Sequence, residues 1–409
     1  MVFASSLIFT LAISGLSSAS VTAKARPRTD APLKVPTYTT YNVSSEHQHL
    51  FGAHSSHAKR SCSTWNTAAE GVASAMQSTY YNSAGYYQGG SGGGSAWTDV
   101  NAVEDLINLS LLNSITTYDG VPEAVLSYYQ NQLATSGAYD DALWGVLANF
   151  RQCDYAAFRG TSTSNCISRA TTLYNVVVGA WDSSTCNGGV WWSSAKTYKN
   201  SITNELFLLT SAAGYLRTGQ SAFLSNAQLA WNWIENSGLQ NSAGLFNDGL
   251  TTACANNGQT TWTYNQAIIT SGLGALYVAT GSSDTSLLTA AEKSIDATFS
   301  TMETNGILKE SCDSNTGATT CDADQQIFKG VFMKHLSYYL TYVNDATKVS
   351  KYTGQINAQA SGIYYYGTGS GWIVGSVWYA GNSGGSIFSP KTQTSGLAGL
   401  TAGSEYASC

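Results

Sequence analysis

The sequence predicts an all-α protein, and more specifically a closed (α/α)6 toroid made of six helical hairpins. In twelve segments after residue 61, apolar residues recur at the spacing of one helix face, and no segment shows convincing strand alternation. A pattern that ends a helix also occurs twice, 62 residues apart, at positions 215 and 277. The length of 409 residues is sufficient for one large helical barrel. These observations favour a single helical domain over residues 61–409.

Residues 1–23 are typical of a signal peptide. They carry no charge, contain the apolar stretch 7–13 and end in the small residues Val21, Thr22 and Ala23. The usual charged residues before the apolar stretch are missing, and the alternatives are a disordered tail or a membrane anchor. The stretch is too short to span a bilayer. We therefore expect a secreted protein that does not associate with a membrane.

Residues 24–60 differ in composition from the rest of the chain. They hold three of the five prolines and four of the five histidines, and they end in the basic pair Lys59-Arg60. This composition predicts a pro-segment that ends in a dibasic processing site, although two basic residues can also be adjacent by chance.

The helical patterns that follow have the lengths of ordinary globular helices. We expect helices at 64–82, 98–115, 121–133, 139–157, 164–179, 199–217, 221–237, 262–279, 285–301, 322–342, 345–360 and 391–404. The segment 362–389 is rich in Gly, Ser and Tyr, and it predicts either a short hairpin or a long loop.

The repeat supports pairing of these helices into hairpins. Tyr-Leu-Arg-Thr-Gly at 215–219 recurs as Tyr-Val-Ala-Thr-Gly at 277–281, and a new helical pattern follows each copy at once. Gly219 and Gly281 stand where a helix C-terminus favours left-handed backbone. Twelve helices in six such hairpins predict the toroid.

The eight cysteines indicate disulfides. They form no CxxC pair, which weakens a zinc or redox interpretation, and their number is even. Connectivity is not readable from the sequence, but Cys153 with Cys166 and Cys312 with Cys321 would close short loops. Two glycosylation sequons, at Asn42 and Asn108, agree with secretion. The C-terminus lacks the apolar tail of a GPI signal, which favours a freely secreted protein.

Charge and histidine content exclude several classes of function. Residues 61–409 hold 13 Lys and Arg against 23 Asp and Glu, with no basic run that could neutralise phosphates, so a nucleic-acid partner is not expected. Their single histidine, His335, lies in a helical pattern and is interpreted as structural. A Ser-His-Asp triad, a His-rich metal site and a nucleotide-binding glycine motif are all disfavoured, so we expect neither metal nor cofactor. Carboxylates remain for acid–base chemistry.

Asp140 and Asp141 are the candidate catalytic pair. They begin a helical pattern whose buried stripe includes Leu143 and Leu147, and helical spacing places Asp140 on that stripe with Asp141 beside it. Two neighbouring carboxyl groups raise each other's pKa, and glycoside cleavage needs one ionised and one protonated carboxyl. A separation of about 5–5.5 Å would fit a retaining mechanism. The alternative is that Asp140 is an N-cap and Asp141 complements the helix dipole.

Loops rich in aromatic and amide side chains are the candidate substrate-binding segments. Aromatic faces suit sugar rings, and amides can contact hydroxyl groups. The alternative is that each aromatic belongs to the core. The candidates are Trp144, Trp191, Trp192, Asn204, Asp248, Trp262, Tyr264, Asn265 and Gln266.

Together these segments resemble glycoside hydrolase family 76, the endo-acting α-1,6-mannanases of bacteria and fungi. The resemblance rests on Tyr-Asp-Asp at 139–141, Gly-Gly-Val-Trp-Trp at 188–192, Asn-Asp-Gly at 247–249, Thr-Trp-Thr-Tyr-Asn-Gln at 261–266 and Asp-Gln at 324–325, and it spans most of residues 64–345. It implies an (α/α)6 fold and retaining catalysis. Asp140 is then the nucleophile and Asp141 the acid/base.

The leading expectation is therefore a secreted, monomeric hydrolase that cleaves internal α-1,6-mannosidic bonds of mannan. Two alternatives stay open. A covalent intermediate can pass to a sugar acceptor instead of water, which would make the protein a cell-wall transglycosylase. A catalytically silent mannan-binding protein could also retain the aromatic cleft.

Overall fold

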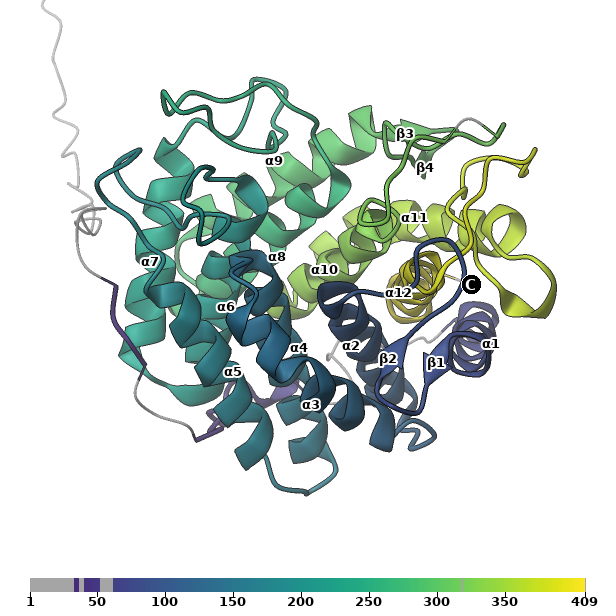
Figure 1. Cartoon of the computed structure of the whole chain (residues 1–409), viewed down its shortest axis with the longest axis horizontal. Coiled ribbons are helices and arrows are strands. Elements are labelled where there is room, and N and C mark those ends of the chain that lie inside the picture. The colour runs from purple at the N-terminus through teal and green to yellow at the C-terminus, as the bar shows by residue number, and fades with distance from the viewer. Residues whose placement is uncertain (1–32, 37–39, 52–61, 318, 409) are drawn as a thin grey trace, which may run out of the picture.

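The computed structural model describes residues 33–36, 40–51, 62–317 and 319–408, which form a ring of twelve α-helices (Figure 1). The expected signal peptide lies outside the described residues, and so do Lys59 and Arg60.

Along the chain, the helices belong alternately to an outer and an inner ring. Their bounds are α1 Ser63–Thr79, α2 Ala96–Asn113, α3 Gly120–Thr135, α4 Tyr139–Phe158, α5 Ser164–Val178, α6 Ser201–Thr218, α7 Ser221–Asn236, α8 Thr263–Ala279, α9 Thr285–Thr301, α10 Phe328–Val343, α11 Ala346–Gly362 and α12 Pro390–Tyr406. Two antiparallel hairpins of two-residue strands lie in the connections between helices. Strand β1 Tyr81–Asn82 pairs with β2 Tyr86–Tyr87 between α1 and α2, and β3 Glu303–Thr304 pairs with β4 Ile307–Leu308 between α9 and α10.

The even-numbered helices form a closed inner ring. Each of α2, α4, α6, α8, α10 and α12 contacts the next, and α12 contacts α2. The odd-numbered helices lie outside them, as Figure 1 shows, and α5, α7 and α9 contact α4, α6 and α8, respectively. This arrangement confirms the predicted (α/α)6 toroid.

Inner helices are buried on nearly all sides, because neighbours surround them. In α6 every residue except Tyr215 is buried, including polar Thr210 and Ser211. Small residues allow close approach between α10 and α12: a Cβ on Gly330 would lie 2.3 Å from the Cα of Ser395. The amphipathic pattern therefore indicates helices correctly, but it does not mark one solvent face on the inner ring.

Most predicted helices agree with the structure to within about two residues, which is the ordinary uncertainty of helix ends. There are two exceptions. The helix expected at 64–82 ends at Thr79, and residues 81–82 form strand β1. The helix expected at 322–342 begins only at Phe328, as α10. The Asp322 side chain accepts hydrogen bonds from the backbone N–H groups of Asp324 (2.9 Å) and Gln325 (3.0 Å). This local turn competes with helix formation.

The helix ends at the sequence repeat have the expected backbone. Gly219, with φ of 68°, is the left-handed C-cap of α6, and Gly281 follows α8 with φ of 83°. The segment 362–389 is a long loop with short helical turns and two isolated bridges, Thr368 with Val374 and Gly375 with Phe388.

Three disulfides connect described cysteines. Cys153–Cys166 and Cys312–Cys321 confirm the two expected short loops. Cys186–Cys254 joins two loops that are far apart in the sequence. Within the described part of the chain, no helix is both long and apolar enough to cross a membrane.

Candidate active site

A cleft of about 500 Å³ opens at the end of the toroid where the inner helices begin. The residues that line it come from the starts of α2, α4, α8 and α10 and from the loops before α4, α6, α8 and α10. They are Ser95, Trp97, Ala138, Asp140, Asp141, Trp144, Trp192, Tyr198, Asn200, Asp248, Trp262, Tyr264, Asp322, Asp324, Gln325 and Phe328.

Asp140 and Asp141 lie in the first turn of α4. The N-cap is Ala138, so Asp140 does not cap the helix. The chain before α4 pairs with the loop after Trp191: the backbone N–H of Tyr139 donates to the carbonyl of Trp192 at 3.0 Å. This pairing holds Trp192 beside the carboxylates, and its indole Nε1 donates to Oδ2 of Asp140 at 3.0 Å.

The two aspartates have different electrostatic surroundings. Burial raises the pKa of Asp140 to about 6, while the Trp192 hydrogen bond and the N–H groups at the helix start act in the opposite direction. Burial, followed by the charges of Asp140 and Asp324, raises the pKa of Asp141 to about 8. No Lys or Arg is among the described residues that line the cleft. Asp141 therefore keeps its proton at a pH where Asp140 is ionised.

The two oxygens of the Asp140 carboxyl group also differ in their hydrogen bonds. Oδ1 is buried and has no hydrogen-bond partner among the described residues, whereas Oδ2 is occupied by Trp192. An ionised, partly desolvated carboxylate oxygen at the wall of a cleft can act as a nucleophile.

Stacked aromatic rings form the other walls of the cleft. Trp97 stacks on Trp144, with ring centroids 5.7 Å apart, and Tyr264 stacks on Phe328 at 3.8 Å. Trp262 meets Phe328 edge-on. Such walls fit the apolar faces of sugar rings, and an uncharged polysaccharide needs no cation for its recognition.

Asp248 lies on the side of the cleft nearest α6. The Tyr198 hydroxyl donates to Asp248 Oδ2 at 2.5 Å, and Asn257 donates to the same hydroxyl at 2.8 Å. Burial raises the pKa of Asp248, and the Tyr198 hydrogen bond partly opposes this shift. The Asp248 carbonyl accepts from the N–H of Ser201, which fixes this loop to the start of α6.

Seven of the predicted site residues line the cleft: Asp140, Asp141, Trp144, Trp192, Asp248, Trp262 and Tyr264. The other four lie outside its lining. Asn204 bonds both backbone groups of Val190, and Gln266 does the same at Phe246, so both hold loops in place.

The remaining two predicted residues are Trp191 and Asn265. The ring of Trp191 lies 4.7 Å from the Lys199 ammonium group, and Asn265 is fully buried. His335, interpreted as structural, is also fully buried, with Nδ1 2.9 Å from the Ser271 hydroxyl.

Several cleft residues were missed as site candidates, among them Trp97, Tyr198 and Asp324. Trp97 donates to Asp324 Oδ1 at 3.0 Å, across 227 positions of sequence. The helix predicted at 322–342 includes Asp324, although Asp324 also stands in the Asp-Gln motif at 324–325 that supports the family resemblance. The turn-forming Asp322 is the local signal for a loop at this position.

Comparison with known proteins agrees with this geometry. The family model described as glycosyl hydrolase family 76 matches residues 64–404. Mannan endo-1,6-alpha-mannosidase DFG5 of Saccharomyces cerevisiae is 27% identical over 245 residues, which cover 57% of this chain and 51% of the yeast protein. A putative mannan endo-1,6-alpha-mannosidase of Schizosaccharomyces pombe is 24% identical, over 78% of this chain and 74% of its own. The chain thus spans about half the length of the first relative and three quarters of the second.

Solved structures share the fold. An inactive variant of the α-1,6-mannanase of Salegentibacter sp. HEL1_6, with two consecutive aspartates replaced by asparagine and with α-1,6-mannotriose bound, matches with a TM-score of 0.71. The identity is 18%, over 83% of this chain and 99% of the other. Dfg5 of Chaetomium thermophilum, in complex with glucosamine, matches with a TM-score of 0.70 at 17% identity, over 85% of this chain and 92% of the other.

Proposed function

Because this chain belongs to glycosyl hydrolase family 76, we propose that it is an endo-acting hydrolase of internal α-1,6-mannosidic bonds in mannan, with retention of configuration. The observation that carries the proposal is the asymmetric pair of carboxyl groups in an aromatic cleft. Asp140 is held by Trp192 and has one free oxygen, whereas Asp141 has the higher pKa of the two.

The reaction follows in two steps. The Asp140 carboxylate attacks the anomeric carbon while Asp141 gives its proton to the glycosidic oxygen, so the glycosidic bond breaks and a glycosyl ester forms. Asp141, now ionised, takes a proton from water, and the resulting hydroxide attacks the same carbon and releases Asp140. Both carboxyl groups return to their starting states.

The test is incubation of the purified protein with linear α-1,6-mannan and measurement of new reducing ends. The parent should produce short oligosaccharides. Asp141→Asn should lose about 10²–10⁴-fold in rate, and Asp140→Asn should lose at least as much because it removes the nucleophile. Asp119→Asn, which changes an exposed acid outside the cleft, is the matched control. A parent without turnover, or an Asp140→Asn variant as fast as the parent, would refute the assignment.

Product analysis separates the hydrolase from the two alternatives. Masses extended by an added oligosaccharide acceptor would identify transfer to sugar in place of water. Tight retention of mannan without turnover, unchanged by replacing either aspartate, would identify a binding protein.

We also propose that residues 1–23 direct secretion and are removed. The disulfides support this proposal, because such bonds persist in oxidising compartments. N-terminal sequencing of the protein from the culture medium would test it, and a product that keeps residues 1–23 would contradict it.

A further inference from the structure

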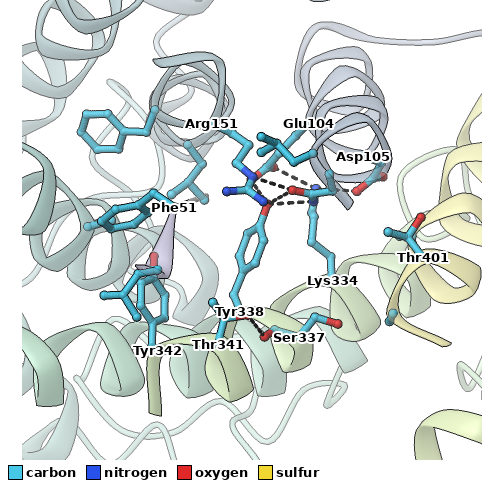
Figure 2. Close-up of a pocket in the computed structure, with 18 of the residues that line it drawn as sticks. Phe51, Glu104, Asp105, Arg151, Lys334, Ser337, Tyr338, Thr341, Tyr342 and Thr401 are labelled. Carbon is cyan, nitrogen blue, oxygen red and sulfur yellow. Dashed lines mark hydrogen bonds and ion pairs between the residues drawn. The ribbon is translucent and has the colours of Figure 1, made fainter. Parts of the chain in front are cut away.

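The end of the toroid opposite the cleft holds a small chamber. The C-terminal halves of α2, α4, α6, α10 and α12 enclose it, whereas the cleft lies at the N-terminal ends of the inner helices. Its volume of about 60 Å³ admits a few water molecules but no sugar ring. Figure 2 shows Arg151, Glu104 and Lys334 pointing toward one another in this chamber, with Phe51 at its edge.

Buried charges surround the chamber. Arg217 Nη2 and Asp154 Oδ2 lie 2.7 Å apart, and Lys334 Nζ lies 2.9 Å from Glu104 Oε2. Asn108 is engaged here as well: its amide donates to the Tyr338 hydroxyl at 2.9 Å and accepts from Arg151 at 2.6 Å.

The N-terminal strap, defined as residues 33–36 and 40–51, closes this end. Leu50 and Phe51 line the chamber and are each 4% exposed. The guanidinium carbon of Arg217 lies 4.1 Å from the centroid of the Phe51 ring. This is the burial expected of core residues, although the strap precedes the helical domain and belongs to the expected pro-segment.

Polar contacts fix the strap to the same ion pair. The Tyr41 hydroxyl donates to Asp154 Oδ1 at 2.9 Å, and the backbone N–H of Asn42 donates to the carbonyl of Arg217 at 2.7 Å. The strap therefore shields Asp154 and Arg217 from water on the side that the helices leave open.

A second anchor lies on the outer helices. The buried side chain of Asn226 accepts from the N–H of Lys34 at 2.9 Å and donates to the Lys34 carbonyl at 2.7 Å. Asn175 donates to the Pro36 carbonyl at 3.3 Å. Two separate anchors on one peptide reinforce each other, because each holds the other close to its site.

We propose that the strap stays bound after the chain is cut at Lys59-Arg60, as a noncovalent peptide subunit that seals the chamber. It does not inhibit the enzyme, because it lies at the end opposite the cleft. Loss of the peptide would open the chamber to water and expose the charges of Arg217 and Asp154.

In the test, the folded, full-length protein is cleaved at Lys59-Arg60, and dissociation of the strap is measured. Lys59-Arg60 is the only pair of adjacent basic residues in the sequence, so a protease specific for paired basic residues has one target. A protease recognition site inserted between Arg60 and Ser61 provides the cut if the natural pair resists. After gel filtration, native mass spectrometry should find the peptide bound, with the thermal midpoint within about 2 °C of the uncut protein.

Phe51→Ala should weaken retention of the peptide by about a hundredfold or more, because it empties a core position. Val35→Ala is the matched control, since Val35 is 55% exposed on the same strap. Release of the parent peptide after the cut, whatever the thermal midpoint, would overturn the proposal. A large rise in mannan hydrolysis on cutting, together with loss of the peptide, would also overturn it and identify an inhibitory pro-segment.

Discussion

Replacement of Trp192 by Phe tests how the cleft prepares its nucleophile. The indole N–H donates to Asp140 Oδ2 at 3.0 Å, and this hydrogen bond lowers the pKa of Asp140 against the effect of burial. Phe keeps an aromatic ring beside Tyr198, whose centroid is 6.4 Å away, but it has no donor. The substitution therefore removes the hydrogen bond and should raise the pKa of Asp140.

The size of the shift follows from the exposure of the bond. A hydrogen bond to a charged group contributes about 1.5–3 kcal/mol, but Trp192 is 43% exposed, so water replaces part of the lost interaction. A remaining loss of about 1 kcal/mol corresponds to about 0.7 pKa unit. Because Asp140 attacks in its ionised form, the acidic limb of kcat/KM against pH should move upward by this amount.

The assay is a full pH profile of kcat/KM on α-1,6-mannan oligosaccharides. The alkaline limb is an internal control, since it reports loss of the Asp141 proton and Trp192 donates its hydrogen bond to Asp140 and not to Asp141. Trp231→Phe, on outer helix α7, is the matched control variant. An acidic limb that stays in place, or moves to lower pH, would refute the role given to Trp192.

Three further substitutions test other parts of the structure. Asp141→Asn should lose activity on mannan yet cleave a dinitrophenyl glycoside of the same sugar, because that leaving group needs no proton; equal loss on both substrates would contradict an acid role. Asp154→Asn should lower the free energy of unfolding by about 3–5 kcal/mol in denaturant titration, since it leaves Arg217 buried without its partner, and a loss below about 1 kcal/mol would contradict this. Burial raises the pKa of Glu205 well above its usual value, so the parent should lose stability as pH rises above the unfolded pKa of this group toward its folded pKa. Glu205→Gln should therefore raise the thermal midpoint more at pH 8 than at pH 4, and an equal change at both would show that Glu205 does not carry this dependence.

The sequence predicts the helices well because each helix has a recognisable pattern in its own residues. Apolar spacing marks a helix wherever it lies in the ring. Gly219 marks the end of a helix, because it has a left-handed backbone conformation that other residues adopt only with strain. The adjacent aspartates are also a local signal. Their different protonation, however, depends on Trp192 and Asp324, which reach them from other parts of the chain.

The sequence did not show whether an amide side chain binds substrate or holds a loop in place. Asn204 and Gln266 occur in the same segments as true cleft residues, but both satisfy loop backbone within the protein. An amide bonds equally well to a sugar hydroxyl or to a peptide group, so only its position in the fold decides between these roles.

The sequence by itself determined the helical class, the hairpin repeat, the two short disulfide loops and the carboxylate pair, because these features depend on residues close together along the chain. Only the tertiary structure decided that Trp97 meets Asp324, that α10 begins at Phe328 and that Leu50 and Phe51 of the strap line the chamber at the far end of the ring. Those features join segments that are distant in sequence, and their energies come from burial and partner geometry that exist only once the toroid closes.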